Sequence, residues 1–505
     1  MSFAVVSHAH RNIFAVNGHP QGARYGGDPH QRSGRDLRLD LFRGLSLIFI
    51  FIDHVPDNVL SYLTLQSFSF CDAAEVFIFI SGYAAAIVYG KALQRRGSII
   101  ATAQIYRRVW QLYVAHIFLF VIFAALVFYA TLNVQHQNYN EDLGIDNFVD
   151  EPNIAIVKTL LLQYQPKYLD ILPLYVVLLG IFPLVLLLLR RHLALPVMVS
   201  AVIYLLTLHF GWQPHSYPDD EAWYFNPLAW QFLFVIGATA GYAPYSRQVL
   251  TMPSAWLAKL AIGITVAVAI IHISWTIHGA YEAFPGLLLQ ELSPLVDDKA
   301  NLAPLRLASF LALAVTAGHL VRRNNRLLHT PVARLIIRCG QHSLQVFCLG
   351  VLLAVLGEIL LTSVRDDIAM QLAISLAGIV LMVAIGGLLT WYKGETQCVR
   401  TRSSPPIRTL RGERFWPVSP RVLPASLRQS VRQAHCRTVQ ASPSARRRGG
   451  ETGLNGGRMK GRSVALLVSM ISLAGCARPV ELLFKNSTIV DHLDGNYQRP
   501  CILHI

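Results

Sequence analysis

The chain has 505 residues, of which 53% are hydrophobic and 14% are charged, and its formal net charge is +15. A typical soluble domain carries about 25% charged residues, so this composition indicates an integral membrane protein. Residues 394–505 hold 18 Lys and Arg against 6 Asp and Glu, which places +12 of the net charge in the tail. No folded basic motif accompanies this charge, so we do not expect a nucleic-acid partner.

Residues 1–34 are polar and rich in Gly, His and Arg, and they predict a disordered cytoplasmic extension. Ten apolar segments follow, each close to the roughly 20 residues that a helix needs to cross the hydrocarbon core. They predict an all-α integral membrane bundle over residues 35–393, with spans at about 39–54, 72–90, 110–131, 170–189, 194–211, 226–243, 257–275, 303–321, 342–362 and 371–391. Lys and Arg mark every second loop, so the positive-inside rule predicts a cytoplasmic N-terminus and a cytoplasmic end of the last span.

The first span carries ionisable residues at both ends. Such residues inside a span cost about 2.5–3.5 kcal/mol each, which makes them functional candidates. Arg43 and His54 are 11 residues apart, about three turns, so they share one helix face some 16 Å apart along the axis. Asp40 lies three residues before Arg43 and can pair with it. Asp53 precedes His54 directly and points elsewhere, and Pro56 ends the helix.

The second span runs in the opposite direction and begins with two carboxylates, Asp72 and Glu75. If spans one and two are antiparallel neighbours, Glu75 faces His54, which is the arrangement of a general base and its orienting carboxylate. Gly82 lies two turns below Glu75 and leaves room for another helix or a ligand. The alternative is that Asp53 and Asp57 are interfacial residues and that His54 only caps the span before Pro56.

Polar residues further along the chain are open to two interpretations each. Asn226 and Gln231 either line a cavity or form hydrogen bonds between helices. Residues 154–163, "IAIVKTLLLQ", lie in the long loop that we predict outside the membrane. They form either an amphipathic helix at the interface or a connector that packs on the bundle.

The composition changes at about residue 394. Residues 394–458 are rich in Arg, Pro and Ser and predict a disordered segment. Residues 459–505 begin with "MKGRSVALLVSMISLAGCARP", which resembles a bacterial lipoprotein signal, although such signals act at an N-terminus. This segment is either a further short hydrophobic element or a second reading frame joined to the first, and whether the tail belongs to the protein stays open.

Three motifs resemble those of the acyltransferase-3 superfamily of membrane O-acyltransferases. "DLFRGLSLIFIFIDH" contains Arg43, ten residues and then His54, and "EVFIFISGY" is similar to the acidic-x-x-F-x-x-S-G-F/Y element of the second helix. "RRVWQLY" resembles the entrance to the third helix, with Gln111 where Pro is usual. Stretches such as "YLDILPLYVVLLGIFPLVL", "NPLAWQFLFVIGA" and "DKANLAPLRLASFLAL" resemble the OpgC branch, named for the succinylation of osmoregulated periplasmic glucans.

The resemblance implies a multi-pass enzyme of the bacterial inner membrane. It would transfer an acyl group, expected to be succinyl, from acyl-CoA to hydroxyls of a periplasmic glucan or another cell-envelope polysaccharide. His54 and Glu75 would be catalytic, with His54 as general base or transient acyl carrier, and Arg43, Arg107 and Arg108 would bind the CoA phosphates. Acyl-CoA is then a co-substrate, and we expect no bound cofactor or metal. The supporting residues of the cavity would be Asp40, Asp53, Asp72, Ser81, Gly82, Asn226 and Gln231.

Two other classes of protein remain open. A proton-coupled transporter would use Asp53, His54 and Glu75 as a relay. Transporters usually contain internal repeats with paired broken helices, and the sequence holds no second copy of the Arg-x10-His or S-G-Y motif. A structural or tethering membrane protein would tolerate charge-neutral replacements in the first two spans. The sequence leaves the acyl group, the acceptor, direct transfer versus an acyl-enzyme, and the oligomeric state open.

Overall fold

The computed structural model describes residues 36–134, 139–218, 222–246, 254–280, 285–322 and 325–403, without the side chains of residues 280 and 394–403. The predicted N-terminal extension and nearly all of the tail lie outside these ranges. The described residues form helices and two isolated β-bridges. The α-helices are α1 (Leu37–Asp53), α2 (Ala73–Arg96), α3 (Ser98–Asn133), α4 (Tyr139–Asp142), α5 (Asp146–Asp150), α6 (Pro152–Leu160), α7 (Ile171–Arg191), α8 (Ala194–Phe210), α9 (Pro227–Tyr242), α10 (Ala255–Ala280), α11 (Leu289–Leu292), α12 (Pro304–Leu320), α13 (Pro331–Gln341), α14 (Ser343–Ser363) and α15 (Ile368–Ser403). Short 3-10 helices are η2 (Val59–Leu63), η3 (Leu65–Ser67), η4 (Ala243–Tyr245), η5 (Ser293–Leu295) and η6 (Arg326–His329).

Each of the ten predicted spans coincides with a helix. Within the described residues, six helices are long and apolar enough to cross a membrane, namely α2, α3, α7, α10, α14 and α15. Two shorter apolar helices are α8 and α12, while α1 and α9 have 17 and 16 residues. The fold is therefore that of an all-helical, multi-pass membrane protein, and the number of spans stays a prediction.

Two segments are more helical than the sequence predicts. α13 occupies a stretch that we predict as part of a basic cytoplasmic loop. Its buried Ala333, Ile337 and Gly340 form one apolar face that packs against α1. Within the outer loop, α6 covers most of the stretch that we describe as either interfacial or connecting. Buried Ala155 and Thr159 hold one face of α6 on the protein, whereas Ile156 and others remain exposed.

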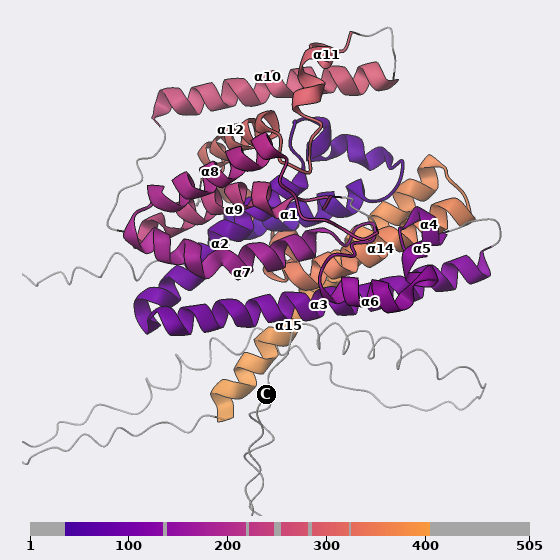
Figure 1. Ribbon diagram of the computed structural model, residues 1–505, viewed down its shortest axis with the longest axis horizontal. Coiled ribbons are helices and arrows are strands. Elements are labelled where there is room, and N and C mark those ends of the chain that lie inside the picture. Colours follow the sequence, from indigo (N-terminus) through magenta and orange to yellow (C-terminus); the bar gives the residue numbers. More distant parts are fainter. Residues whose placement is uncertain are drawn as a thin grey trace, which may run out of the picture.

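Figure 1 shows most of the long helices lying side by side along the long axis of the molecule. α10 lies along one edge, where it packs on α12, and α15 leaves the bundle obliquely at the opposite edge. The interior is closed by large buried side chains such as Trp230, Phe123, Phe182 and Phe234. α2 packs on both α1 and α9, and this places the first turn of α2 at the end of the bundle that carries the candidate site.

Glycines set a close helix crossing between α2 and α9. A Cβ atom at Gly82 would overlap the carbonyl oxygen of Phe234, and one at Gly237 would overlap that of Phe79. Small residues let helix backbones approach closely in membrane proteins, where van der Waals packing drives association. Of the two possibilities that the sequence leaves for Gly82, a neighbouring helix is the one that the structure shows.

Candidate functional site

The candidate site lies where the end of α1, the start of α2 and the segments before α7 and α12 meet. Asp72 is the N-cap of α2 and accepts a hydrogen bond from the Ala74 N–H at 2.7 Å. The Glu75 carboxylate accepts from the Asp72 N–H at 2.9 Å, which completes a capping box. The sequence Asp-Ala-Ala-Glu therefore fixes both carboxylates at the first turn of the helix.

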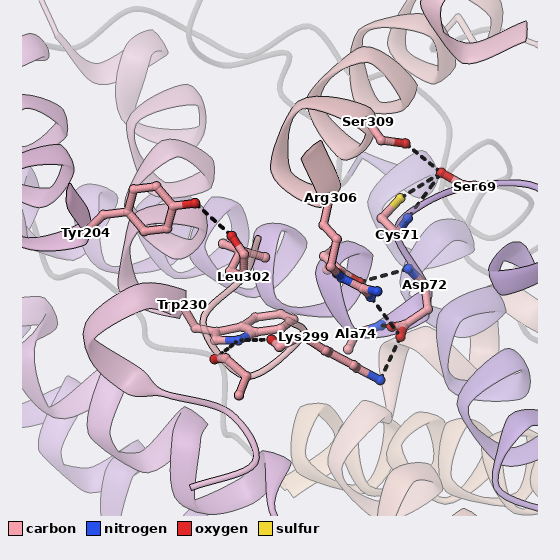
Figure 2. A network of polar contacts seen from close by, with 12 residues as sticks. Ser69, Cys71, Asp72, Ala74, Tyr204, Trp230, Lys299, Leu302, Arg306 and Ser309 are labelled. Atoms are coloured by element: carbon pink, nitrogen blue, oxygen red, sulfur yellow. Dashed lines mark hydrogen bonds and ion pairs between the residues drawn. The ribbon is translucent and has the colours of Figure 1, made fainter. Parts of the chain in front are cut away.

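Two cations from the chain around α12 reach these carboxylates (Figure 2). Lys299 Nζ lies 2.7 Å from Asp72 Oδ2, and Arg306 Nη2 lies 3.2 Å from the same oxygen. Arg306 also donates through Nε to Glu75 Oε1 at 2.9 Å. The Glu75 side chain is fully buried and that of Arg306 is 11% exposed, so this pair is shielded from solvent.

Hydrogen bonds from α9 hold the segment that carries Lys299 in place. The Trp230 indole N–H donates to the carbonyls of Lys299 and Ala300 at 3.2 and 3.1 Å. Ser69 and Ser309 hydroxyls, 2.9 Å apart, join the chain before α2 to α12 (Figure 2). These contacts fix the direction of Lys299 and Arg306 toward Asp72.

Burial and charge act in opposite directions on this network. Burial raises the pKa of Asp72, but Lys299 and Arg306 outweigh it, so that the pKa lies below the usual range of an aspartate. Burial lowers the pKa of Lys299, but Asp72, Tyr224 and Glu75 raise it above the usual range of a lysine. Asp72 and Lys299 therefore stay charged at neutral pH, and Arg306 lies between Asp72 and Glu75.

His54 is the C-cap of α1, and its ring is oriented by the helix itself. Nδ1 lies within hydrogen-bond distance of the Ile50 carbonyl oxygen, one turn earlier. Since a carbonyl can only accept, Nδ1 carries the proton and Nε2 presents a lone pair. Lys299, Asp72 and Lys167 lie near enough to interact electrostatically with the imidazole. The structure thus brings His54 and the charge network to the same end of the bundle.

A second polar cluster packs against His54. The Tyr168 ring meets the imidazole edge-on, with 4.8 Å between centroids, and its hydroxyl donates to Glu358 Oε2 at 2.7 Å. Lys167 Nζ donates to Glu358 Oε1, also at 2.7 Å. Tyr168 has a φ of 73°, a left-handed conformation that aromatic residues rarely adopt. Burial and the Glu358 carboxylate raise the pKa of Tyr168, so it remains a neutral donor.

The structure does not bring Glu75 to His54 as the sequence predicts. Both Glu75 oxygens have other partners, Arg306 and the Asp72 N–H. No hydrogen bond or ion pair joins Glu75 to His54 in the part of the chain that is described. The capping box turns the Glu75 side chain back over its own helix end, and the Ile50 carbonyl orients the imidazole instead.

Asp53 points away from the imidazole, as its place in the helix predicts. Its Oδ1 accepts a hydrogen bond from the Thr64 hydroxyl at 2.6 Å. Asp40 is buried in the first turn of α1, where Gly340 of α13 packs on its backbone carbonyl. Ser81 is buried within α2. These residues support the packing of the helices that carry the site.

The three arginines that we predict to bind the CoA phosphates lie away from the His54 end of α1. Arg43 donates to the Ile80 carbonyl at 3.2 Å and so joins α1 to α2. Arg108 is half-buried, donates to Gln111 at 3.3 Å and lies near enough to Cys348 for an electrostatic interaction. Arg107 is exposed. Arg108 therefore faces the bundle, whereas Arg107 faces outward.

Asn226 and Gln231 form hydrogen bonds between structural elements. Asn226 caps α9 and donates to the Trp212 carbonyl and to Asn301 at 2.7 and 2.8 Å. Gln231 donates to the Ser200 carbonyl at 3.0 Å and accepts from the Ser200 hydroxyl, which joins α9 to α8. Their contacts fit the second of the two interpretations that the sequence leaves open. In the described residues, no cluster of three or more His, Cys, Asp or Glu side chains could hold a metal ion.

Sequence reasoning missed four residues of the site: Lys167, Glu358, Lys299 and Arg306. Two of them carried a signal, since Arg306 and Glu358 are charged residues inside apolar spans. Such residues are functional candidates in any membrane protein. Lys167 and Lys299 lie in loops, where only the fold shows that they turn inward.

Comparison with known proteins finds one relationship. No curated protein matches the chain, and no solved structure matches it. A family model described as OpgC protein matches residues 35–394, which is more than half of the chain. The match contains α1 to α14, most of α15 and every residue of the site described above. The chain therefore belongs to the OpgC protein family.

Proposed function

We propose that the protein is an integral-membrane O-acyltransferase of the bacterial inner membrane. It transfers an acyl group, expected to be succinyl, from acyl-CoA to hydroxyls of a periplasmic glucan or a related cell-envelope polysaccharide. Family membership supports a glucan-modifying membrane acyltransferase. The observation that carries the chemistry is His54, whose Nδ1–H is held by Ile50 so that Nε2 is available as a base.

In this proposal His54 activates the acceptor. Nε2 takes the proton of a glucan hydroxyl while the hydroxyl oxygen attacks the carbonyl carbon of the thioester. The tetrahedral intermediate collapses, the bond from carbon to sulfur breaks, and the leaving thiolate takes the proton from Nε2. The products are an ester and free CoA, and the histidine returns to its starting state. Transient acylation of Nε2 is the alternative route, and it ends in the same products.

The charge network has a supporting part in the proposal. Arg306 and Lys299 hold Asp72 and Glu75 at the first turn of α2, close to the histidine end of α1. The positive potential of Lys299 and Lys167 near the imidazole would favour the oxyanion that forms during attack. Glu75 acts through Arg306 and not as the partner of His54.

The basic residues at the other end of the bundle remain the proposed donor site. Arg43 and His54 lie 11 residues apart on one helix, which corresponds to about 16 Å. Guanidinium groups bind phosphate well because their donors form a planar fork. We propose that Arg43 and Arg108 meet the CoA phosphates, with Arg107 at the surface. A thioester arm would then reach toward His54 along α1.

The test is the substitution His54→Gln, which keeps polarity and approximate size but removes the base. Loss of one general base costs about 10²- to 10⁴-fold in rate. We therefore expect the acyl content of purified glucans, measured by mass spectrometry, to fall to background while the protein stays in the membrane fraction. His209→Gln at the exposed end of α8 serves as the control. Full acylation in His54→Gln cells would overturn the proposal, and proton-coupled flux independent of CoA would favour a transporter.

A further inference from the structure

A large apolar cavity lies between α1, α2 and α12. Its volume is about 1270 Å³, more than the roughly 300–1,000 Å³ of small-molecule pockets. Its walls are mostly aliphatic and aromatic, with Phe42 and Phe49 from α1, Phe79 from α2 and Phe310 from α12. Neither His54 nor the charge network around Arg306 lines it. The cavity reaches Ala73 and Val76 in the first turns of α2, next to that network, but contains no residue of it.

Basic side chains gather at one end of this cavity. Arg38, His319 and Arg322 line it there. The Arg38 guanidinium donates to the Val321 carbonyl at 3.0 Å, which places the start of α1 beside the end of α12. Arg38 also pairs with Asp36 at 2.8 Å, whereas Arg322 has no carboxylate partner within the described residues. The cavity end thus carries a net positive charge.

The length of the cavity matches one leaflet of a bilayer. From Arg38 to Phe49 is 11 residues of α1, about 16 Å, and from His319 to Phe310 is 9 residues of α12, about 14 Å. The hydrocarbon core of a bilayer is about 30 Å thick, so one leaflet contributes about half of that. An acyl chain anchored at the charged end would follow both helices to the middle of the membrane.

The wall of the cavity is open near its charged end. A Cβ atom built at Gly318 meets no heavy atom within 4 Å, in contrast to the closed glycine crossing of α2 and α9. The cavity-lining part of α12 continues through half-buried Ala314 and Leu311. A headgroup has room at Gly318, and the chain below it has an apolar wall.

We propose that this cavity binds one anionic phospholipid from the leaflet on the Arg322 side. Basic pockets between transmembrane helices bind anionic headgroups, and here Arg322 and Arg38 meet the phosphate. One acyl chain lies along Phe42, Phe49 and Phe310. The lipid fills the space between α12 and the pair of α1 and α2, and so supports the helix that brings Arg306 to Glu75.

The experiment is native mass spectrometry of the full-length protein, purified in mild detergent and incubated with mixed micelles of phosphatidylglycerol or phosphatidylcholine. We expect the protein to retain one phosphatidylglycerol in preference to phosphatidylcholine. Arg322→Gln should lower phosphatidylglycerol retention about fivefold, as expected for one cation at a lipid phosphate. Ala314→Trp should abolish retention of either lipid because the indole fills the cavity.

Ala308→Trp provides the matched control, since this alanine lies on the same helix but is exposed and does not line the cavity. It should retain phosphatidylglycerol like the unsubstituted protein. Equal retention by Ala314→Trp and the unsubstituted protein would overturn the proposal, and so would equal retention of the two lipids. Displacement of phosphatidylglycerol by succinyl-CoA would also overturn it, because the cavity would then belong to the donor.

Discussion

Glu75 and Arg306 form the most deeply buried ion pair of the described residues. Glu75 is fully buried, and its two oxygens meet Arg306 and a backbone N–H. Two charges that are removed from water need each other, because either one alone keeps its full desolvation cost. The pair therefore adds little to the free energy of unfolding, but removal of one partner lowers that free energy strongly.

The substitution Glu75→Gln should destabilise the protein by about 3–5 kcal/mol, because it leaves the buried Arg306 guanidinium with Asp72 alone. The measurement is thermal unfolding of the purified protein in detergent. Glu291→Gln, an exposed carboxylate before α12, should change stability by less than about 0.5 kcal/mol. The double variant Glu75→Gln/Arg306→Met should recover part of the loss. Unchanged stability of Glu75→Gln would contradict the burial that the structure gives this pair.

Residue patterns reveal which positions are unusual but not which ones meet. The sequence identifies Asp72, Glu75 and His54 as ionisable groups at one membrane level. It pairs His54 with Glu75 because both lie on neighbouring spans, whereas the carboxylate meets Arg306, 231 residues away. The sequence also does not show which group orients the His54 ring. That group is the backbone carbonyl of Ile50, and any residue can supply a backbone carbonyl. Long-range pairing and backbone acceptors both require the fold.

At the scale of elements, apolar length was enough to place the helices. Long apolar runs have to be helical in a membrane because their backbone groups need internal partners, and all ten predicted runs are helices. Helix neighbours were harder to predict. The crossing of α2 and α9 depends on Gly82, Gly237 and Gly241 facing the opposite backbone. Gly82 and Gly237 lie 155 residues apart, and nothing in a single sequence indicates that they are neighbours in space.

Gly82→Ala tests the crossing of α2 and α9. The new methyl group would overlap the Phe234 carbonyl, so the helices must separate. Overpacking of this kind costs about 1–3 kcal/mol, and more where backbone has to move. Gly180→Ala in α7 is the matched control because no heavy atom lies within 4 Å of its built Cβ. That substitution should be neutral or stabilise by up to about 1 kcal/mol. Equal melting temperatures of the two variants would argue against the close crossing.

At the scale of the whole molecule, the open question is how many helices cross the bilayer. α1, α8 and α12 have 17 residues each and α9 has 16, which gives lengths of about 24–26 Å. The hydrocarbon core is about 30 Å thick, and a short helix is accommodated by local thinning at modest cost. Arg190 and Arg191 before α8 favour a crossing, since basic loops stay in the cytoplasm.

We therefore predict that α8 crosses the membrane. His192→Cys, before α8, and Gln213→Cys, after it, are both exposed positions. In spheroplasts, a membrane-impermeant maleimide should label Gln213→Cys, whereas His192→Cys should be labelled only after permeabilisation. The unsubstituted protein gives the background from native cysteines. Labelling of both positions from outside would mean that α8 lies on the outer surface. The side of the membrane assigned to every later loop depends on this crossing. That result would therefore also reverse the side assigned to the end of α15.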